Sequence, residues 1–174
     1  MAVESASKLF YLVADPVTAH WLTYLQMVEH IMRAVRSGKD VCVAFYGHPG
    51  VFSFPPHQAL RIAKAEGYMA KMLPGISSED CLMADLGLDP STSGCQSFEG
   101  SDFLINHRRY DDTSLLVLWQ IGEIGQSALP MRNCDRRPLR VLTSRLEERY
   151  SASHKVKIYE AAIHGEPIAI ARLL

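Results

Sequence analysis

Short apolar runs alternate with helix-like segments through residue 88, and this alternation constrains the fold more than any other feature. The runs "KLFYLVAD" (8–15), "VCVAFY" (41–46) and "YMAKML" (68–73) are typical of strands buried on both faces. Between them, residues 23–40 and 56–67 carry apolar side chains at helical spacing. Because strand–helix alternation favours a parallel sheet covered by helices, we expect an α/β fold.

Local signals predict where the helices begin and end. Thr23 and Gln26 have the spacing of a capping box, which predicts the start of the first helix. Gly38 and Gly67 are predicted to end the first and second helices. Ser77 is predicted to cap a short third helix.

The second half of the chain has the same character after a stretch rich in turn-forming residues. That stretch, "LDPSTSGCQSFEGSD" (88–102), is the best candidate for a domain boundary. Beyond it we expect a strand at 114–122, an amphipathic helix at 138–150 and a strand at 154–162. We therefore expect a two-lobed α/β fold, with lobes at residues 1–95 and 96–174.

Composition narrows the classes of partner and compartment. The 174 residues carry a formal net charge of −1, which gives no electrostatic reason to expect nucleic acid or an anionic membrane as a partner. No apolar run approaches the ~20 residues of a membrane span, and the N-terminus has no secretion signal. The four cysteines are scattered and form no CxxC pair, which favours reduced thiols in a cytoplasmic protein.

The ends of the predicted strands are the candidate binding positions, because ligands of open α/β sheets bind there. Gly47-His48-Pro49-Gly50 follows the strand at 41–46, and Pro74-Gly75-Ile76-Ser77 follows the strand at 68–73. In the second lobe, Gln120 and the pair Ala161-Ala162 end strands. These four positions predict a ligand cleft between the lobes.

Each candidate also has a structural alternative. The GHPG turn is equally consistent with an ordinary connection between a strand and a helix, and His48 with a solvent-facing turn residue. Ser77 is more typical of a helix cap than of a nucleophile, since no GxSxG elbow surrounds it. Tyr24 fits interfacial packing and Trp119 fits the core. No phosphate-binding loop, dinucleotide fingerprint or histidine–carboxylate metal grouping is present in the sequence.

Six separated segments carry a resemblance to a known family. They are "FYLVADPVTAHWL" (10–22), "TYLQM" (23–27), "FYGHPGVF" (45–52), "AKAEGYMAKMLPGISSEDCLMADLGLDP" (63–90), "SFEGSDFLI" (97–105) and "LVLWQIG" (116–122). In this order they resemble the tetrapyrrole methylase superfamily, and within it the borosin-type peptide backbone N-methyltransferases.

The resemblance implies S-adenosylmethionine (SAM) as methyl donor, held between two α/β lobes, and a homodimer. It implies that Tyr24 lies close to the methyl-accepting amide. It also implies donor-binding roles for three groups of residues: the turn Tyr46, Gly47, His48, Pro49, Gly50, Val51 and Phe52; the loop Gly75, Ile76, Ser77 and Ser78; and Gln120, Tyr159, Ala161 and Ala162.

The chain also departs from the family pattern. Family members carry an additional segment, with tyrosines and an arginine, between the parts matching "HWL" and "TYLQM", whereas Leu22 is followed here directly by Thr23. The chain also lacks the family's glycine-rich first strand, and it ends at "IAIARLL" without an appended precursor peptide. This ending favours a peptide substrate supplied in trans over self-methylation.

Three functions are compatible with these features. The first is SAM-dependent N-methylation of backbone amides in a peptide, which the segments "FYGHPGVF" and "PGISSEDCLMADLGLDP" favour. The second is C-methylation of a tetrapyrrole ring of the precorrin type. The third is a degenerate, non-catalytic homologue that binds SAM or a partner chain, which the missing segment after Leu22 favours.

Overall fold

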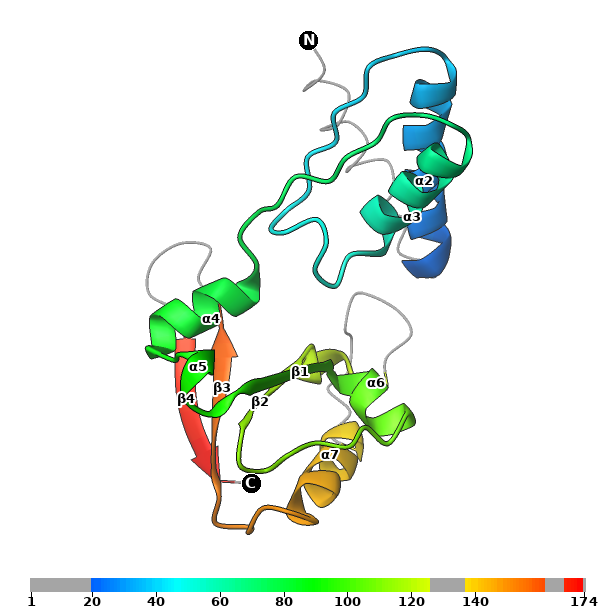
Figure 1. The fold of residues 1–174 in the computed structure, drawn as a ribbon. Coiled ribbons are helices and arrows are strands. Elements are labelled where there is room, and N and C mark those ends of the chain that lie inside the picture. Colours follow the sequence, from blue (N-terminus) through cyan, green and yellow to red (C-terminus); the bar gives the residue numbers. More distant parts are fainter. Residues whose placement is uncertain (1–19, 126–136, 162–167, 174) are drawn as a thin grey trace. The chain divides into compact units, whose positions relative to one another are not determined.

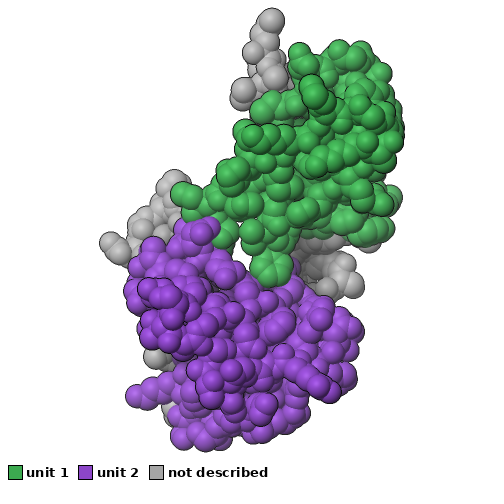
Figure 2. Space-filling view, viewed as in Figure 1, with its two compact units in different colours: residues 1–78, 127–132 green, residues 79–126, 133–174 purple. Residues whose placement is uncertain are grey.

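A computed structural model describes residues 20–125, 137–161 and 168–173. The chain divides into two compact units, and the first division along the sequence falls after Ser78 (Figure 2). The lobe boundary expected at residue 95 stays a prediction. The stretch 88–102, in which we expected it, contains regular structure of the second unit.

The described part of the first unit is built on two packed helices, α2 (His20–Arg36) and α3 (Phe54–Ala65) (Figure 1). Val28 and Met32 of α2 are buried against Ala59 and Ala63 of α3. The two alanines carry only a methyl group, so α3 can approach the larger side chains of α2 closely. This contact is the hydrophobic core of the first unit.

The glycine stops predicted for these helices are confirmed. After α2, Gly38 has φ +79°, its N–H bonds to the carbonyl of Val35, and the next N–H bonds to the carbonyl of Ala34. This is the Schellman motif, and Gly67 with φ +85° forms the same motif after α3. The capping box at Thr23 is wrong, because α2 already begins at His20 and Thr23 lies inside it.

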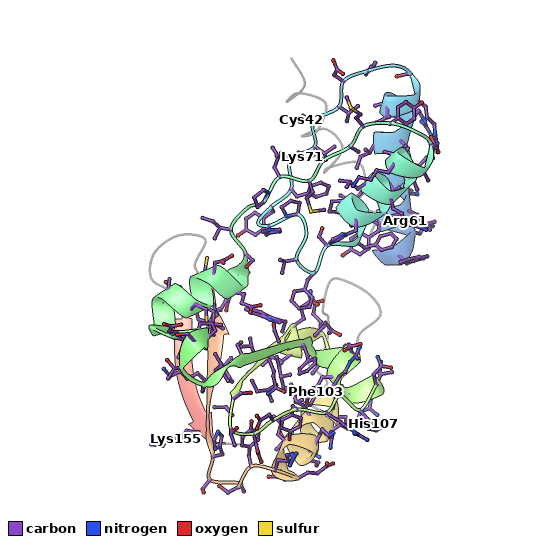
Figure 3. The ribbon with its side chains drawn as sticks, viewed as in Figure 1. Cys42, Arg61, Lys71, Phe103, His107 and Lys155 are labelled. Carbon is purple, nitrogen blue, oxygen red and sulfur yellow. The ribbon has the colours of Figure 1, made fainter. Side chains whose placement is uncertain are left out.

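The strands predicted at 41–46 and 68–73 are wrong: among residues 20–78, the described part of the first unit, no segment forms a strand. Cys42 and Lys71, labelled in Figure 3, belong to these two segments. Met69 is fully exposed and Tyr46 is 82% exposed, whereas a parallel strand needs cover on both faces. The apolar runs were identified correctly, but an apolar sequence does not show whether a segment pairs with another strand. The first predicted strand, at 8–15, lies outside the described residues.

The second unit mixes helices and strands. Its elements, in chain order, are α4 (Ser78–Leu86), α5 (Pro90–Ser93), β1 (Cys95–Glu99), α6 (Gly100–Ile105), β2 (Leu115–Trp119), the 3₁₀-helix η1 (Ile121–Glu123), α7 (Arg137–Glu147), β3 (Lys155–Glu160) and β4 (Ile168–Leu173). Only the first residue of α4 belongs to the first unit.

The strands of the second unit form two pairs. β1 and β2 run parallel, with Cys95 opposite Leu115 and Glu99 opposite Trp119. β3 and β4 run antiparallel. Phe103 of α6, labelled in Figure 3, is completely buried at the centre of the core. Its core neighbours are Tyr110, Ile124, Leu142 and Leu146.

The second unit confirms most of what the sequence predicted there. β2 lies within 114–122, β3 within 154–162, and α7 matches the helix expected at 138–150. β1 was missed, because its residues lie in the turn-rich stretch. The mixture of helices with a parallel strand pair confirms the α/β fold class.

Candidate functional site

The turn formed by residues 48–51 is held by hydrogen bonds of its own. The Val51 N–H donates to the His48 carbonyl at 3.2 Å, which closes a turn with Pro49 and Gly50 at its two central positions. The Gly50 N–H donates to Nδ1 of His48 at 2.9 Å. His48 therefore bonds back onto the turn and does not point freely into solvent.

Gly50 is also bonded from outside the turn. Nε2 of His57, in the first turn of α3, lies 2.9 Å from the Gly50 carbonyl oxygen. A Cβ atom at Gly50 would lie 2.9 Å from Sδ of Met72 and 3.1 Å from Cε1 of His48. A larger residue at Gly50 would therefore have to displace the side chains of Met72 and His48, while the backbone φ of Gly50 itself is not left-handed.

The second predicted loop packs directly on this turn. A Cβ atom at Gly75 would lie 3.0 Å from the Gly47 carbonyl oxygen and 3.4 Å from Cα of His48. Gly47 has φ +75°, and a Cβ there would lie 3.6 Å from the carbonyl oxygen of Ile76. Gly75 thus allows the two backbones to meet, and Gly47 supplies the left-handed φ of the turn. The structure brings together the two segments that the sequence singled out in the first lobe.

The surroundings of these loops are apolar and partly open. Tyr46, Phe52 and Ile76 are 82%, 52% and 71% exposed. Phe52 has φ +48°, a conformation that costs a bulky residue free energy and that occurs preferentially at functional sites. Ser77 is buried and directly precedes α4, so its position fits the predicted helix cap.

Tyr24 reaches the chain segment that follows the turn. Its ring lies 6.3 Å, centroid to centroid, from that of Phe54, the first residue of α3. Trp21, one helical turn earlier, lies 4.5 Å from the same ring. The side chain of Tyr24 is 36% exposed. The packing predicted as the alternative for Tyr24 is therefore present, and its hydroxyl-bearing ring also stays accessible.

In the second unit, Gln120 stands at the end of β2 in a left-handed conformation, with φ 56° and ψ 33°. The preceding residue, Trp119, donates from Nε1 to Oγ of Ser97 at 2.7 Å, and Ser97 donates to Glu79 of α4 at 3.0 Å. This chain of bonds ties the end of β2 to β1 and α4. Trp119 is therefore a bonded residue at the edge of the core rather than a purely apolar core residue.

Tyr159 joins β3 to α4. Its hydroxyl donates to Oδ2 of Asp85 at 2.7 Å. Desolvation by burial, and then the bond to Asp85, raise the pKa of Tyr159 to about 12. Ala161, two residues further along the chain, is half-buried, and Ala162 lies outside the described residues.

The predicted site residues therefore fall into two groups. In the first unit the turn 46–52 packs on the loop that carries Gly75 and Ile76, and Tyr24 lies beside Phe54, which follows the turn; the second unit holds Gln120, Tyr159 and Ala161. That the two groups form one site stays a prediction. Sequence reasoning missed His57, Asp85 and Ser97, because a single polar residue on a predicted helix or in a turn-rich stretch gives no signal of its long-range partner.

The described residues hold neither a metal-binding cluster nor a membrane-spanning helix. Within 20–125, 137–161 and 168–173, no group of three or more His, Cys, Asp or Glu side chains could hold a metal ion. In the same part of the chain, no helix has the length and apolarity that crossing a membrane requires.

The chain has relatives with known roles. The family model described as "Tetrapyrrole (Corrin/Porphyrin) Methylases" matches residues 5–169. A methyltransferase and gymnopeptide precursor from Gymnopus fusipes is 45% identical over 183 residues, which cover 92% of this chain and 44% of the relative. The omphalotin A precursor methyltransferase from Omphalotus olearius is 45% identical over 190 residues, which cover 95% of this chain and 46% of that relative. A type I borosin precursor methyltransferase from Mycena rosella is 36% identical over 191 residues, which cover 97% of this chain and 47% of that relative.

Two facts follow from these alignments. The chain spans less than half the length of these curated relatives. The alignments are also longer than the 174 residues of the chain, so the relatives carry residues within the matched region that this chain lacks. With the α/β fold and the family match over nearly its whole length, the chain belongs to the tetrapyrrole methylase family, in which it resembles the borosin-type members.

Proposed function

We propose that the protein is a SAM-dependent methyltransferase that N-methylates backbone amides of a peptide. Family membership and the methyltransferase names of its relatives support this activity. The observation that carries it in the structure is the packing of Gly75 on Gly47 and His48, since it joins two segments that the family resemblance assigns to the donor.

The residues of the two loops fit a donor of this chemistry. Glycine at 47 and 75 leaves backbone polar groups without side-chain cover, and Gly75 is exposed. Exposed apolar side chains at Phe52 and Ile76 suit contact with the aliphatic and adenine parts of SAM. When bound, SAM supplies a methyl group activated by its sulfonium. The proposed contacts are Tyr46, Gly47, His48, Pro49, Gly50, Val51, Phe52, Gly75, Ile76, Ser77, Ser78, Gln120, Tyr159, Ala161 and Ala162.

Tyr24 is the proposed acceptor-site residue. A backbone amide nitrogen is a poor nucleophile, and it must lose its proton as the new bond to carbon forms. A phenolic hydroxyl can accept or relay that proton, or donate to the amide carbonyl as negative charge develops there. Tyr24 is partly exposed and reaches Phe54, two residues beyond the turn.

The substrate proposal rests on the relatives. Their names join a methyltransferase with a ribosomally synthesized peptide precursor, so each carries its precursor within one polypeptide. A peptide supplied in trans, a homodimer and a cytoplasmic location stay our predictions for this protein. Methylation of a tetrapyrrole remains the alternative activity, since the family as a whole bears that name.

One observation favours a second candidate, a homologue that binds SAM without catalysis. The relatives carry residues within the matched region that this chain lacks, and we expect them after Leu22, where the family's arginine and tyrosines would stand. Loss of these groups would remove assistance to the amide while leaving the two glycine loops in place.

The candidates are separated by one series of measurements on the full chain. Calorimetry with SAM is followed by incubation with SAM and the omphalotin precursor peptide, and mass spectrometry then counts gains of one methylene each. Binding with peptide mass gains supports the proposed activity. Binding without gains on this peptide or on a reduced tetrapyrrole favours the non-catalytic candidate, and no SAM binding contradicts both.

A further inference from the structure

We propose that His57 is a positioning residue for the donor turn and acts through the backbone of Gly50. This inference rests on the proposed function, because it assigns the turn to SAM. The observation behind it is that both backbone polar groups of one glycine are bonded to histidine side chains. The N–H of Gly50 donates to Nδ1 of His48 at 2.9 Å, and its carbonyl lies 2.9 Å from Nε2 of His57.

The two bonds fix the roles of the two rings. A carbonyl oxygen can only accept, so Nε2 of His57 must carry the hydrogen. Nδ1 of His48 accepts, so that nitrogen must be without a hydrogen. Each ring therefore has one defined polar task on Gly50, and each task can be imitated by an amide side chain of the right length.

The two bonds also differ in what they connect. His48 lies two residues from Gly50, so its bond is local and forms within the turn itself. His57 lies on α3, where Pro56 and Ala59 are buried and Ala63 packs on α2. The bond from His57 therefore couples the turn to a helix that is held in the core of the first unit.

The consequence is that His57 sets the place of the turn while other contacts set its shape. Gly50 is also confined by Met72, whose Sδ would lie 2.9 Å from any Cβ there. Met72 lies just before the loop that carries Gly75. Displacement of Gly50 would therefore disturb both the turn and the loop that packs on it. His57 acts on this contact through Gly50.

The test compares two substitutions on the full chain. His57→Ala removes the donor, and His57→Gln places an amide N–H near the position of Nε2–H. His30→Ala, at an exposed position of α2, is the matched control. We expect SAM affinity to fall roughly fivefold in His57→Ala, as the loss of one hydrogen bond implies, and to stay within about twofold in the other two variants.

Two further readouts separate positioning from folding or catalysis. Hydrogen exchange of a peptide spanning residues 46–54 is expected to quicken in His57→Ala, with thermal unfolding of the whole chain little changed. With the peptide substrate, KM for SAM is expected to rise while kcat at saturating SAM stays the same.

The outcomes distinguish this inference from the function on which it rests. SAM binding by the wild type together with equal affinity in His57→Ala would overturn the role of His57 and leave the function standing. A loss in His57→Gln as large as that in His57→Ala would also overturn it, because the donor would then be irrelevant. Failure of the wild type to bind SAM would overturn both.

Discussion

Gly75 packs its backbone against that of Gly47, so closely that a Cβ at Gly75 would stand 3.0 Å from the Gly47 carbonyl oxygen. The two glycines are 28 positions apart, and α3 lies between them. Their contact makes one surface from two loops that each follow an apolar segment. The proposed donor site depends on this contact more than on any single side chain.

Tyr24→Phe tests the acceptor side of the proposed site. The ring and its packing on Phe54 remain, whereas the hydroxyl that would assist the amide is lost. We expect SAM affinity to stay the same and methyl transfer to slow by roughly 10²-fold, the scale of acid–base assistance. Single-turnover mass spectrometry measures the rate, and an unchanged rate would remove Tyr24 from the mechanism.

The bond between Tyr159 and Asp85 predicts a pH-dependent stability. The pKa of Tyr159 is raised from 10.0 to about 12, so folding favours the protonated phenol. The resulting stabilisation is complete below pH 10 and is lost as the pH rises from there through about 12. Over this range we expect the free energy of unfolding to fall more steeply in the wild type than in Tyr159→Phe.

Chemical denaturation of both proteins at several alkaline pH values gives that comparison. The two proteins differ at one side chain, so the difference between their curves isolates Tyr159. A difference that stays constant across the range would show that burial and the bond to Asp85 do not together favour the protonated phenol.

His107 predicts a stabilising substitution. His107 follows α6 and has φ +45°. It occupies the position that Gly38 and Gly67 occupy after α2 and α3, with the same pattern of backbone hydrogen bonds. A left-handed conformation strains a residue with a Cβ, so His107→Gly is expected to stabilise the protein by about 1 kcal/mol. The reverse change, Gly67→His, is the matched control and should destabilise it. Thermal unfolding measures both, and a lower Tm for His107→Gly would contradict the account.

Met32 predicts the sensitivity of the first unit to core truncation. Its side chain is only 1% exposed and packs between α2 and α3. Met32→Ala removes those contacts and leaves a cavity, at an expected cost of about 2–5 kcal/mol. Met69→Ala, at a fully exposed position, is the control and should change stability little. Equal denaturation midpoints for the two variants would show that the α2–α3 contact is not the core.

The sequence predicted local events well. Gly38 and Gly67 end helices where expected, because a left-handed residue after a helix is a local requirement that glycine meets best. β2 and β3 were found because their apolar patterns are short and clear. The strands at 41–46 and 68–73 were wrong for the opposite reason, since a strand exists only with a hydrogen-bonded partner, and residue type does not report the partner.

In the candidate site, too, local features could be predicted from the sequence and long-range contacts could not. The glycines of both loops could be singled out, because glycine commonly occupies positions where backbones approach closely or turn sharply. The bond from His57 to Gly50, and the bonds from Tyr159 to Asp85 and from Trp119 to Ser97, could not be predicted. Each joins residues whose proximity depends on how separate elements pack.

The most direct test of the central claim is calorimetric titration of SAM into the full chain, its Gly75→Ala variant and a control, Gly122→Ala. Gly122 has no left-handed φ, and a Cβ there would meet no atom within 4 Å. We expect the wild type and Gly122→Ala to bind SAM equally well. We expect Gly75→Ala to bind SAM roughly tenfold more weakly, a loss of about 1.4 kcal/mol. Equal SAM affinity in all three proteins, or no binding by the wild type, would contradict the central claim.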